Sequence, residues 1–355
     1  MTQISPVDSS TSDALIYSGA EVLAFEPDPE MMLCDVELSF REVFFPLGFA
    51  LEIRTNDPAV LRAARGRWKD MRRLYDVPGL LLNITVTREE SQECPPAPTA
   101  RGQHFLFSCI ADVHNQMVCD LKTGFGFACL TQAAIRHNSY LYYYFLEGAA
   151  LMMIVALYVT PVHAACVSRH GHGMLFCGES GAGKSTLAYA CARAGWTYTT
   201  DDSSYLHRAS HEPRVIGNSR QIRFRPSAHE LFPELSSRGL TPRAEGKPSI
   251  EVPTAELPGI ITSDEAMVHS IIVLNRQPSA VTELIPISRD AVFDTFSKNL
   301  NPIREMRELH AVALQELAAV DGYELRYNDL DAAIELLERL ARAAPLPRDE
   351  GDHRA

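Results

Sequence analysis

The stretch "MLFCGESGAGKSTLAYACARAGWTYTTDD", residues Met174–Asp202, decides the fold. Within it, "GESGAGKS" (Gly178–Ser185) fits the G-x-x-x-x-G-K-[ST] pattern of a phosphate-binding loop. The apolar "GMLFC" before the loop predicts a strand, and the apolar periodicity after it predicts a helix from Lys184 to about Ala194 that ends at Gly195. A strand, a glycine-rich loop and a helix in this order predict an α/β nucleotide-binding fold.

Each position of the loop has a chemical reason. The glycines let the backbone curl so that successive N–H groups point at phosphate oxygens, and the positive N-terminal end of the following helix adds to this attraction. We expect Lys184 to reach the β- and γ-phosphates of ATP and the Ser185 hydroxyl to bind Mg²⁺. The predicted nucleotide-binding residues are Gly178, Glu179, Ser180, Gly181, Ala182, Gly183, Lys184, Ser185 and Thr186.

Two carboxylates follow the loop at short range. Asp201 and Asp202 stand 17 and 18 residues after Lys184, directly after "WTYTT", which predicts a strand. Both strands of a βαβ unit end at the same edge of the sheet, so we expect the pair beside the γ-phosphate. One carboxylate can help to hold Mg²⁺, and the other can accept a proton from an attacking hydroxyl. The alternative interpretation of "TDDSS" is a simple turn.

The remainder of the chain indicates two domains. The expected parts are a loose leader at 1–35, an N-terminal α+β domain of mostly antiparallel sheet at 36–135, the nucleotide-binding domain at 136–345 and a disordered tail at 346–355. Asp57 and Pro58 predict a helix start, as N-cap and first helical residue. The proline-rich segment 89–102 predicts a surface loop.

Composition limits the function classes. The net charge of −12, with no basic block, argues against a general nucleic-acid binder. The eight cysteines show no metal-ligand spacing, so we expect reduced core thiols in a cytoplasmic protein. The first residues lack the pattern of a signal peptide. The apolar segment Gly148–Val162 is shorter than the roughly 20 residues of a membrane span, which favours a buried helix.

The residues around the loop resemble the catalytic domain of HPr kinase/phosphorylase. The resemblance rests on His163 in "PVHAACV", the "HGHG" hairpin, "GESGAGKS", the helix ending in "RAGW" and the "DD" pair, and it covers roughly residues 160–345. More closely, the chain is similar to the HPr-kinase-related proteins of bacterial genomes. The resemblance implies the nucleotide-binding core shared with phosphoenolpyruvate carboxykinase, serine-kinase activity with ATP and Mg²⁺, and a homo-oligomer.

Carried over to this chain, the resemblance implies a role for each site residue. Lys184 would bind the phosphates and Ser185 the metal ion. Asp202 would act as the general base toward the acceptor hydroxyl, with His163 as an auxiliary catalytic histidine. Asp201 would be the second metal ligand.

The chain also departs from this family. Thr186 stands where the family has a Glu after the loop, and the segment "SRQIRFRPSAHELFPEL" (219–235) lacks the family's glycine-rich signature with its metal-binding Glu. The identity of the acceptor, HPr included, and the reverse phosphorolytic reaction therefore stay open.

Five cations downstream are further candidates. Arg223 and Arg225 of "RQIRFRP", with Arg220 nearby, could clamp a phosphate or form a solvated strand face. Lys247 stands in a polar segment that could fold over ATP, with an ordinary surface lysine as the alternative. Arg276 follows the apolar "SIIVLN" strand and could reach the nucleotide.

The sequence leaves open functions of different classes. The first is a Mg²⁺–ATP-dependent kinase that transfers the γ-phosphoryl group to a hydroxyl of a protein, peptide or small molecule. The second is an ATP-sensing module without phosphoryl transfer. The Asp201–Asp202 pair favours the kinase, because a sensor needs no general base. Carboxykinase-like chemistry on a small acid would need metal ligands that the sequence does not supply.

Overall fold

The computed structural model describes residues 36–88, 91–241, 248–278, 281–298, 300–301 and 303–343. The expected leader at 1–35, the tail at 346–355 and Lys247 lie outside these residues. The chain from Leu38 onward forms one compact unit. It is a mixed α/β structure, and the domain limits given above stay a prediction.

The first sheet of the described chain has seven strands, in the order β1-β2-β3-β7-β6-β5-β4. They are β1 (Phe40–Phe44), β2 (Leu51–Thr55), β3 (Leu80–Thr87), β4 (Thr99–Gln103), β5 (Leu106–Ile110), β6 (Gln116–Asp120) and β7 (Phe125–Thr131). Strands β2, β3 and β7 run parallel and the other pairs antiparallel. The sheet is mixed because the η2 turn (Pro46–Gly48) joins β1 to β2, whereas helix α2 (Pro58–Trp68) returns the chain for a parallel β3.

Local sequence signals explain where α2 begins but not where β4 begins. The Asp57 side chain accepts a hydrogen bond of 2.8 Å from the Ala59 N–H, and Pro58 opens α2, which confirms the predicted helix start. The surface loop predicted over 89–102 is wrong at its end, because β4 begins at Thr99 and pairs with β5. Every residue of β4 is exposed, so the segment carries none of the apolar alternation that indicates a strand.

An apolar helical segment covers one face of this sheet. It runs through α3 (Gln132–Arg136), α4 (Asn138–Tyr140), the π-helical η3 (Leu141–Glu147) and α5 (Gly148–Leu157). The stretch Asn138–Leu157 is long and apolar enough to cross a membrane by length and composition alone, and 56% of its most apolar window is buried inside the protein. Its side chains pack against those of α2, β3 and β6, as those of a core helix do.

A second sheet follows in the sequence. Its strands are β8 (Val159–His163), β9 (Ala165–Arg169), β10 (His172–Cys177), β11 (Thr197–Thr200), β12 (Ser203–His207), β13 (Arg214–Ile216), β16 (Ile261–Thr262), β17 (Glu265–Arg276), β18 (Glu283–Ile287) and β19 (Asp321–Tyr327). Strands β14 (Gln221–Phe224) and β15 (Ile250–Pro253) form a separate ribbon, flanked by the short turns η4 (Pro226–Glu230), η5 (Pro233–Leu235) and η6 (Thr254–Glu256).

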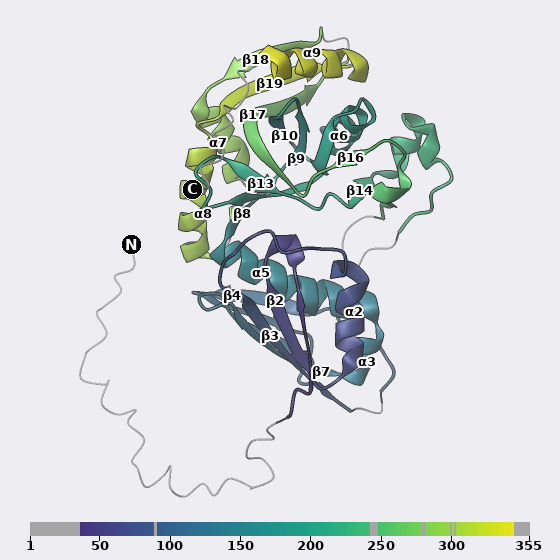
Figure 1. Cartoon of the computed structure of the whole chain (residues 1–355), viewed down its shortest axis with the longest axis vertical. Helices are drawn as coiled ribbons and strands as arrows, with labels where there is room; N and C mark the ends of the chain where they lie inside the picture. The colour runs from purple at the N-terminus through teal and green to yellow at the C-terminus, as the bar shows by residue number, and fades with distance from the viewer. Residues whose placement is uncertain are drawn as a thin grey trace, which may run out of the picture. The chain divides into compact units, whose positions relative to one another are not determined.

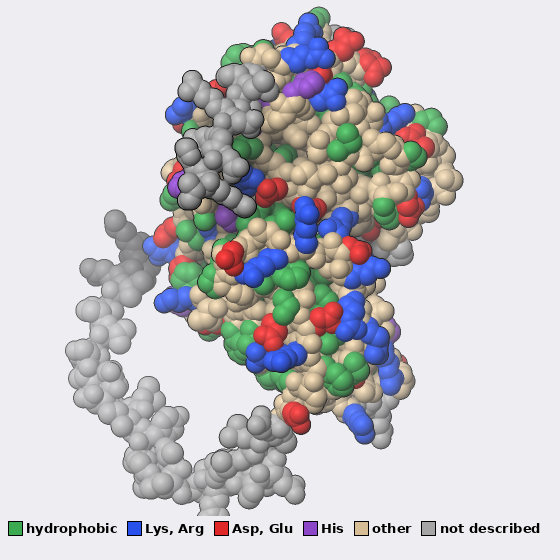
Figure 2. Space-filling view, viewed as in Figure 1, with side chains coloured by type: hydrophobic (Ala, Val, Ile, Leu, Met, Phe, Trp, Pro, Cys, Tyr) green, Lys and Arg blue, Asp and Glu red, His purple; other side chains and the backbone are tan. Residues whose placement is uncertain are grey.

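Helices cover both faces of the second sheet (Figure 1). Helices α6 (Lys184–Arg193) and α9 (Leu330–Ala343) share one buried cluster with the β14–β15 ribbon. Helices α7 (Arg289–Ser297) and α8 (Arg304–Leu317) pack on the opposite face. Strands β10, β17 and β19 are parallel neighbours, so their carboxyl ends meet at one edge of the sheet. On the face shown in Figure 2, acidic and basic side chains are interspersed.

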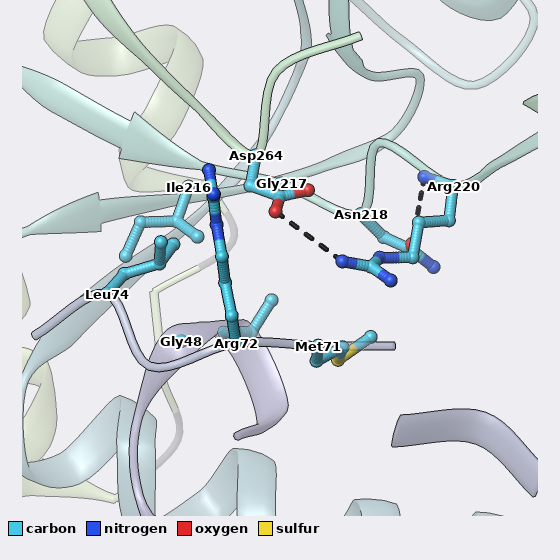
Figure 3. A pocket seen from close by; sticks show the side chains of 10 residues that line it. Gly48, Met71, Arg72, Leu74, Ile216, Gly217, Asn218, Arg220 and Asp264 are labelled. Carbon is cyan, nitrogen blue, oxygen red and sulfur yellow. Dashed lines mark hydrogen bonds and ion pairs between the residues drawn. The ribbon is translucent and has the colours of Figure 1, made fainter. Parts of the chain in front are cut away.

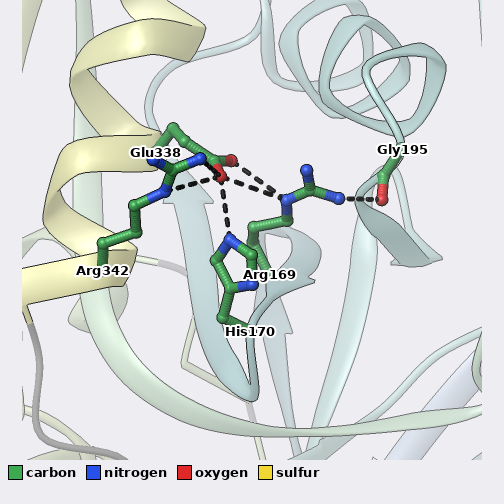
Figure 4. Close-up of polar contacts among 5 residues, drawn as sticks. All are labelled: Arg169, His170, Gly195, Glu338 and Arg342. Atoms are coloured by element: carbon green, nitrogen blue, oxygen red, sulfur yellow. Dashed lines mark hydrogen bonds and ion pairs between the residues drawn. The ribbon is translucent and has the colours of Figure 1, made fainter.

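Glu338 of α9 fastens the β9–β10 hairpin to this helix layer (Figure 4). Its carboxylate accepts hydrogen bonds from Arg169, His170 and Arg342, at 3.0, 2.9 and 3.1 Å. His170 (φ 53°) and Gly171 (φ 77°) form the turn, which confirms the hairpin predicted from "HGHG". Helix α6 ends at Arg193 as predicted, because Gly195 takes the left-handed conformation (φ 85°).

Burial of His310 in α8 makes stability depend on pH. The ring is 1% exposed and donates to the Val155 carbonyl at 3.2 Å, and burial, assisted by the charge of Arg208, lowers its pKa from 6.5 to about 4. Between pH 6.5 and about 4, His310 binds a proton in the unfolded chain but not in the folded chain. The free energy of unfolding should therefore fall by on the order of 2 kcal/mol as the pH drops from 6.5 to 4.

The His310→Gln variant tests this prediction by denaturant unfolding across that pH range. Glutamine can keep the hydrogen bond to Val155 and does not titrate, so the dependence of stability on pH should become less steep. The exposed His211 is the control, because His211→Gln should keep the wild-type slope. An unchanged slope in His310→Gln would contradict the prediction.

Candidate functional site

Two strand pairs, β8–β9 and β11–β12, each form one long strand with a bend, and together they bring His163 and Asp202 close to each other. Strand β9 pairs with β11, and β8, which precedes β9, pairs with β12, which follows β11. The pairs Cys166–Thr200 and His163–Ser203 belong to one antiparallel register, so Asp202 falls beside His163 across the two strands. An extra residue, Thr199, interrupts the β11 pairing just before the bend. Such bulges often redirect side chains next to active sites.

The phosphate loop has the backbone that its glycines allow. Gly178, Gly181 and Gly183 have φ angles of 148°, 97° and 100°, a region that residues with side chains rarely adopt. The loop runs from the carboxyl end of β10 into the N-terminus of α6. Strands β10 and β11 flank β9 and are both antiparallel to it, so they run in the same direction. The expected arrangement at one sheet edge is therefore present, with β9 inserted between the two strands.

Lys184 lies along the inside of the loop. Its Nζ donates to the carbonyl oxygens of Gly178 (3.0 Å) and Glu179 (3.4 Å). Burial lowers the pKa of this ammonium group, and the nearby Asp202 carboxylate partly offsets the effect. Among the described residues, the hydrogen-bond partners of this ammonium group are neutral carbonyls, which leave its charge under-compensated, and an anion in the loop would restore the balance.

Asp201 is the buried member of the carboxylate pair. Its Oδ1 lies 3.2 Å from the Tyr198 hydroxyl, and its Oδ2 accepts from the Arg223 backbone N–H at 3.1 Å. Burial raises its pKa to about 6, and the hydrogen bond from Arg223 opposes that rise. The Ser185 hydroxyl lies 3.4 Å from the Asp201 carbonyl oxygen. Asp201 thus links β11 to the β14 ribbon behind the loop.

Asp202 is the exposed member of the pair. Its side chain is 51% exposed, and its Oδ1 lies 3.3 Å from Nδ1 of His163. Burial lowers the pKa of His163; the Asp202 carboxylate opposes this, and the Lys184 ammonium adds to it. A solvent-accessible carboxylate beside an imidazole whose pKa is lowered by burial is an arrangement suited to proton transfer.

The three candidate arginines have different surroundings. Arg220 lies 3.6 Å from Asp264, and Arg223 pairs with Glu251 at 3.2 Å. Arg225 has no carboxylate partner among the described residues. Its guanidinium donates to the Ser180 hydroxyl at 2.9 Å and lies within van der Waals reach of Gly181. The solvated-face interpretation therefore fits Arg223, whereas Arg225 lies over the phosphate loop.

A small hollow lies beside Arg220 (Figure 3). Met71 and Arg72 approach it from one side, and Gly217 and Asp264 line the other. Its volume of about 20 Å³ is close to that of one water molecule. It is too small to hold a phosphate acceptor.

Sequence reasoning did not identify two groups that hold the site in place. Tyr198 supports Asp201, and Glu251 neutralises Arg223. Tyr198 stands three residues before Asp201, and nothing in that spacing indicates their contact. Glu251 is brought to Arg223 only by the pairing of β14 with β15, which the sequence did not reveal.

Comparison with known proteins gives limited information. No family model and no curated protein sequence matches the chain. Among solved structures, the chain is similar to the HPr(Ser) kinase/phosphatase from Coxiella burnetii, with a TM-score of 0.28 and 17% sequence identity. That match covers 52% of this chain and 95% of the other. It is a weak structural resemblance.

Proposed function

We propose that this chain is a kinase that transfers the γ-phosphoryl group of Mg²⁺–ATP to a hydroxyl group, such as that of a serine, in a protein, peptide or small molecule. One observation carries the proposal, namely the exposed Asp202–His163 pair beside the phosphate loop. A loop of this kind holds the donor, and a carboxylate at its edge can act on the acceptor. The loop and the parallel strands around it would be a nucleotide-binding core of the HPr kinase and phosphoenolpyruvate carboxykinase type.

In the proposed reaction, each residue has one task. The loop N–H groups and Lys184 orient the phosphates and offset the charge that develops on them. Asp202 accepts the proton of the acceptor hydroxyl. The hydroxyl oxygen then bonds to the γ-phosphorus while the bond between the γ-phosphorus and the bridging oxygen of ADP breaks. His163, 3.3 Å from the Asp202 carboxylate, orients Asp202 and can pass the proton on to solvent.

The residues around Ser185 fit a Mg²⁺ ion. No group of three or more His, Cys, Asp or Glu is arranged for a metal ion in the described part of the chain. Mg²⁺ commonly takes one or two protein ligands together with substrate phosphates, so a serine hydroxyl and one carboxylate are enough protein ligands for it. Ser185 and Asp201 would hold it, since each Asp201 oxygen accepts one hydrogen bond and keeps a further lone pair. The ion would neutralise charge on the β- and γ-phosphates.

The alternative function is an ATP-binding sensor without phosphoryl transfer. A single-turnover assay with γ-labelled ATP, Mg²⁺, purified protein and a library of serine-containing peptides separates the two. The kinase predicts label on a peptide, on the protein itself or, slowly, on water. ATP that is bound in the presence of Mg²⁺ and recovered intact under all of these conditions would support the sensor.

The position of Arg225 leads to a prediction about the reaction rate. A guanidinium over Ser180 and Gly181, with no carboxylate partner in the part of the chain that the structure describes, can stabilise the charge on the transferred phosphoryl group. Arg225→Ala should lower the turnover rate about a hundredfold and change the Kd for ATP far less. The control is Arg223→Ala, which removes an arginine already paired with Glu251. Equal rate losses in the two variants would contradict the role given to Arg225.

A further inference from the structure

Helix α2 and the turn after it carry a group of cations. Residues 62–73, "RAARGRWKDMRR", contain six basic residues and one acidic residue in a chain whose net charge is −12. The segment is a local exception to the absence of a basic block noted above. All six basic side chains are exposed, namely Arg62, Arg65, Arg67, Lys69, Arg72 and Arg73.

The packing of α2 directs these cations to solvent. Leu61 and Trp68 are buried in the core beneath the first sheet, and Ala64 lies between them on the same side of the helix. Arg62 and Lys69 are seven residues apart, which is about two turns, so they share one exposed face. At 1.5 Å per residue, the helix holds them about 10 Å from each other.

Half of these cations have no carboxylate partner. Arg65 pairs with Glu42, and Arg73 pairs with Asp76. The Arg67 guanidinium lies over an aromatic ring instead. Within the described ranges no acidic side chain pairs with the remaining three, which we call the α2 cations: Arg62, Lys69 and Arg72. Exposed cations of this kind are available to the carboxylates of a binding partner.

The α2 cations lie next to the elements that hold the carboxylate pair of the site. Arg72 and Arg220 line the same small hollow (Figure 3). Strand β14 begins one residue after Arg220, and the Arg223 backbone N–H of this strand donates to Asp201 at 3.1 Å. Three residues of a strand span about 10 Å. A short peptide can therefore reach from α2 to the carboxylates.

The π-helical η3 makes a second connection between α2 and the site. The Arg67 guanidinium lies 5.3 Å from the centre of the Tyr142 ring, and this ring lies 5.5 Å from that of Trp68. Tyr205 of β12 packs against the same buried cluster as α2 and η3. Strand β12 begins directly after Asp202. Packed side chains therefore hold α2 and the proposed general base in a fixed relation.

The size of this surface favours a short acidic segment over a long polyanion. The eleven residues of α2 form a helix about 16 Å long. That length matches about five residues of an extended peptide. A nucleic acid carries its charge well beyond this length and would meet the remainder of a chain whose net charge is −12.

We propose that the α2 cations bind an acidic segment of the phosphate acceptor and so bring its hydroxyl group to Asp202. The inference rests on the proposed function and names its substrate class. The acceptor is a protein or peptide with several Asp or Glu residues within about ten positions of the hydroxyl-bearing residue, since ten extended residues span about 33 Å. It is not a small molecule.

Fluorescence anisotropy with two labelled peptides and the full chain tests the binding. Each peptide has about fifteen residues and a central serine, flanked in one by glutamates and in the other by glutamines at the same positions. The wild type should bind the glutamate peptide about tenfold or more tightly than the glutamine peptide, and added NaCl should reduce the difference. Arg62→Glu/Lys69→Glu should weaken binding of the glutamate peptide about tenfold.

Two further variants control for net charge and for folding. Arg289→Glu/Lys298→Glu makes the same change of charge at the two ends of α7, where both residues are exposed, and should bind the glutamate peptide as the wild type does. A glutamate at position 69 opposes the dipole at the end of α2. Arg62→Gln/Lys69→Gln avoids this and should still weaken binding about threefold. Thermal unfolding shows whether each variant keeps the fold.

The outcomes separate this inference from the proposed function. Equal affinity for the two peptides, or equal losses in the α2 and α7 variants, would overturn the inference. So would tighter binding, through the same cations, of a single-stranded oligonucleotide or of phosphatidylglycerol vesicles.

The single-turnover assay with the same two peptides completes the test. Faster labelling of the glutamate peptide by the wild type, lost in Arg62→Glu/Lys69→Glu, would support both proposals. Equal labelling of the two peptides would support the kinase and overturn the acidic docking site. A glutamate peptide that binds through α2 and is recovered unlabelled, with ATP intact, would refute the kinase and leave a binding surface for acidic segments.

Discussion

Replacing Asp202 with asparagine should lower the rate of phosphoryl transfer by about 10²- to 10⁴-fold. Asparagine has nearly the same shape as aspartate but cannot take up the acceptor proton. The Kd for Mg²⁺–ATP should stay within about threefold of the wild-type value, because Asp202 faces solvent and His163 rather than the loop backbone. A rate assay and a titration on the same preparation measure both quantities.

Asp76→Asn is the matched control for this experiment. Asp76 is an exposed aspartate that pairs with Arg73, so its amide variant should keep wild-type turnover and ATP binding. If Asp202→Asn transfers phosphate at the wild-type rate, Asp202 is not the general base. If it loses ATP binding as well as turnover, Asp202 contributes to the nucleotide site instead.

Lys184→Ala should reduce the affinity for ATP by about a hundredfold or more. Within the described ranges the lysine is held inside the loop by carbonyl oxygens, so its charge is available to phosphate. Its burial without a carboxylate contact also costs folding energy, as its lowered pKa indicates. The alanine variant should therefore unfold at the wild-type denaturant concentration or a higher one.

Titration calorimetry and denaturant unfolding test the two parts of this prediction separately. Lys122→Ala, in an exposed turn after β6, is the control and should bind ATP as the wild type does. Wild-type ATP affinity in Lys184→Ala would exclude the loop as the phosphate site. A strongly destabilised variant would show that Lys184 supports the loop in the absence of nucleotide.

Much of the fold near the loop could be predicted because its signals are local. The limits of α6, the turn at His170–Gly171 and the cap at Asp57 each depend on residues a few positions apart. The region after Asp202 could not be predicted in this way. Strand β13 pairs with β17 about fifty residues later, and β14 pairs with β15, so the partners are distant and the strands are short.

The same distinction applies to the site. The order of loop, helix and aspartates predicts Asp201 and Asp202 at the sheet edge where the loop begins, and β10 and β11 do run in the same direction. Their different environments could not be predicted, because Asp201 is buried by Tyr198 and by the β14 backbone. The contact between Arg225 and Ser180 likewise spans 45 residues. Contacts that depend on the β14–β15 ribbon can be identified only from the three-dimensional structure.

The continuous register of the two bent strands has a consequence for how this chain tolerates changes in length. His163 meets Asp202 because residues 159–166 and 200–207 keep one register through the bend, beyond the extra residue Thr199. One residue inserted between Thr200 and Asp202 would move Asp202 and every later side chain of β12 to the opposite face and separate His163 from Asp202. Insertions in the segment 209–212, between β12 and β13, leave that alignment intact. Length variation among natural or engineered forms should therefore gather there, and the spacing from His163 to Asp202 should stay fixed.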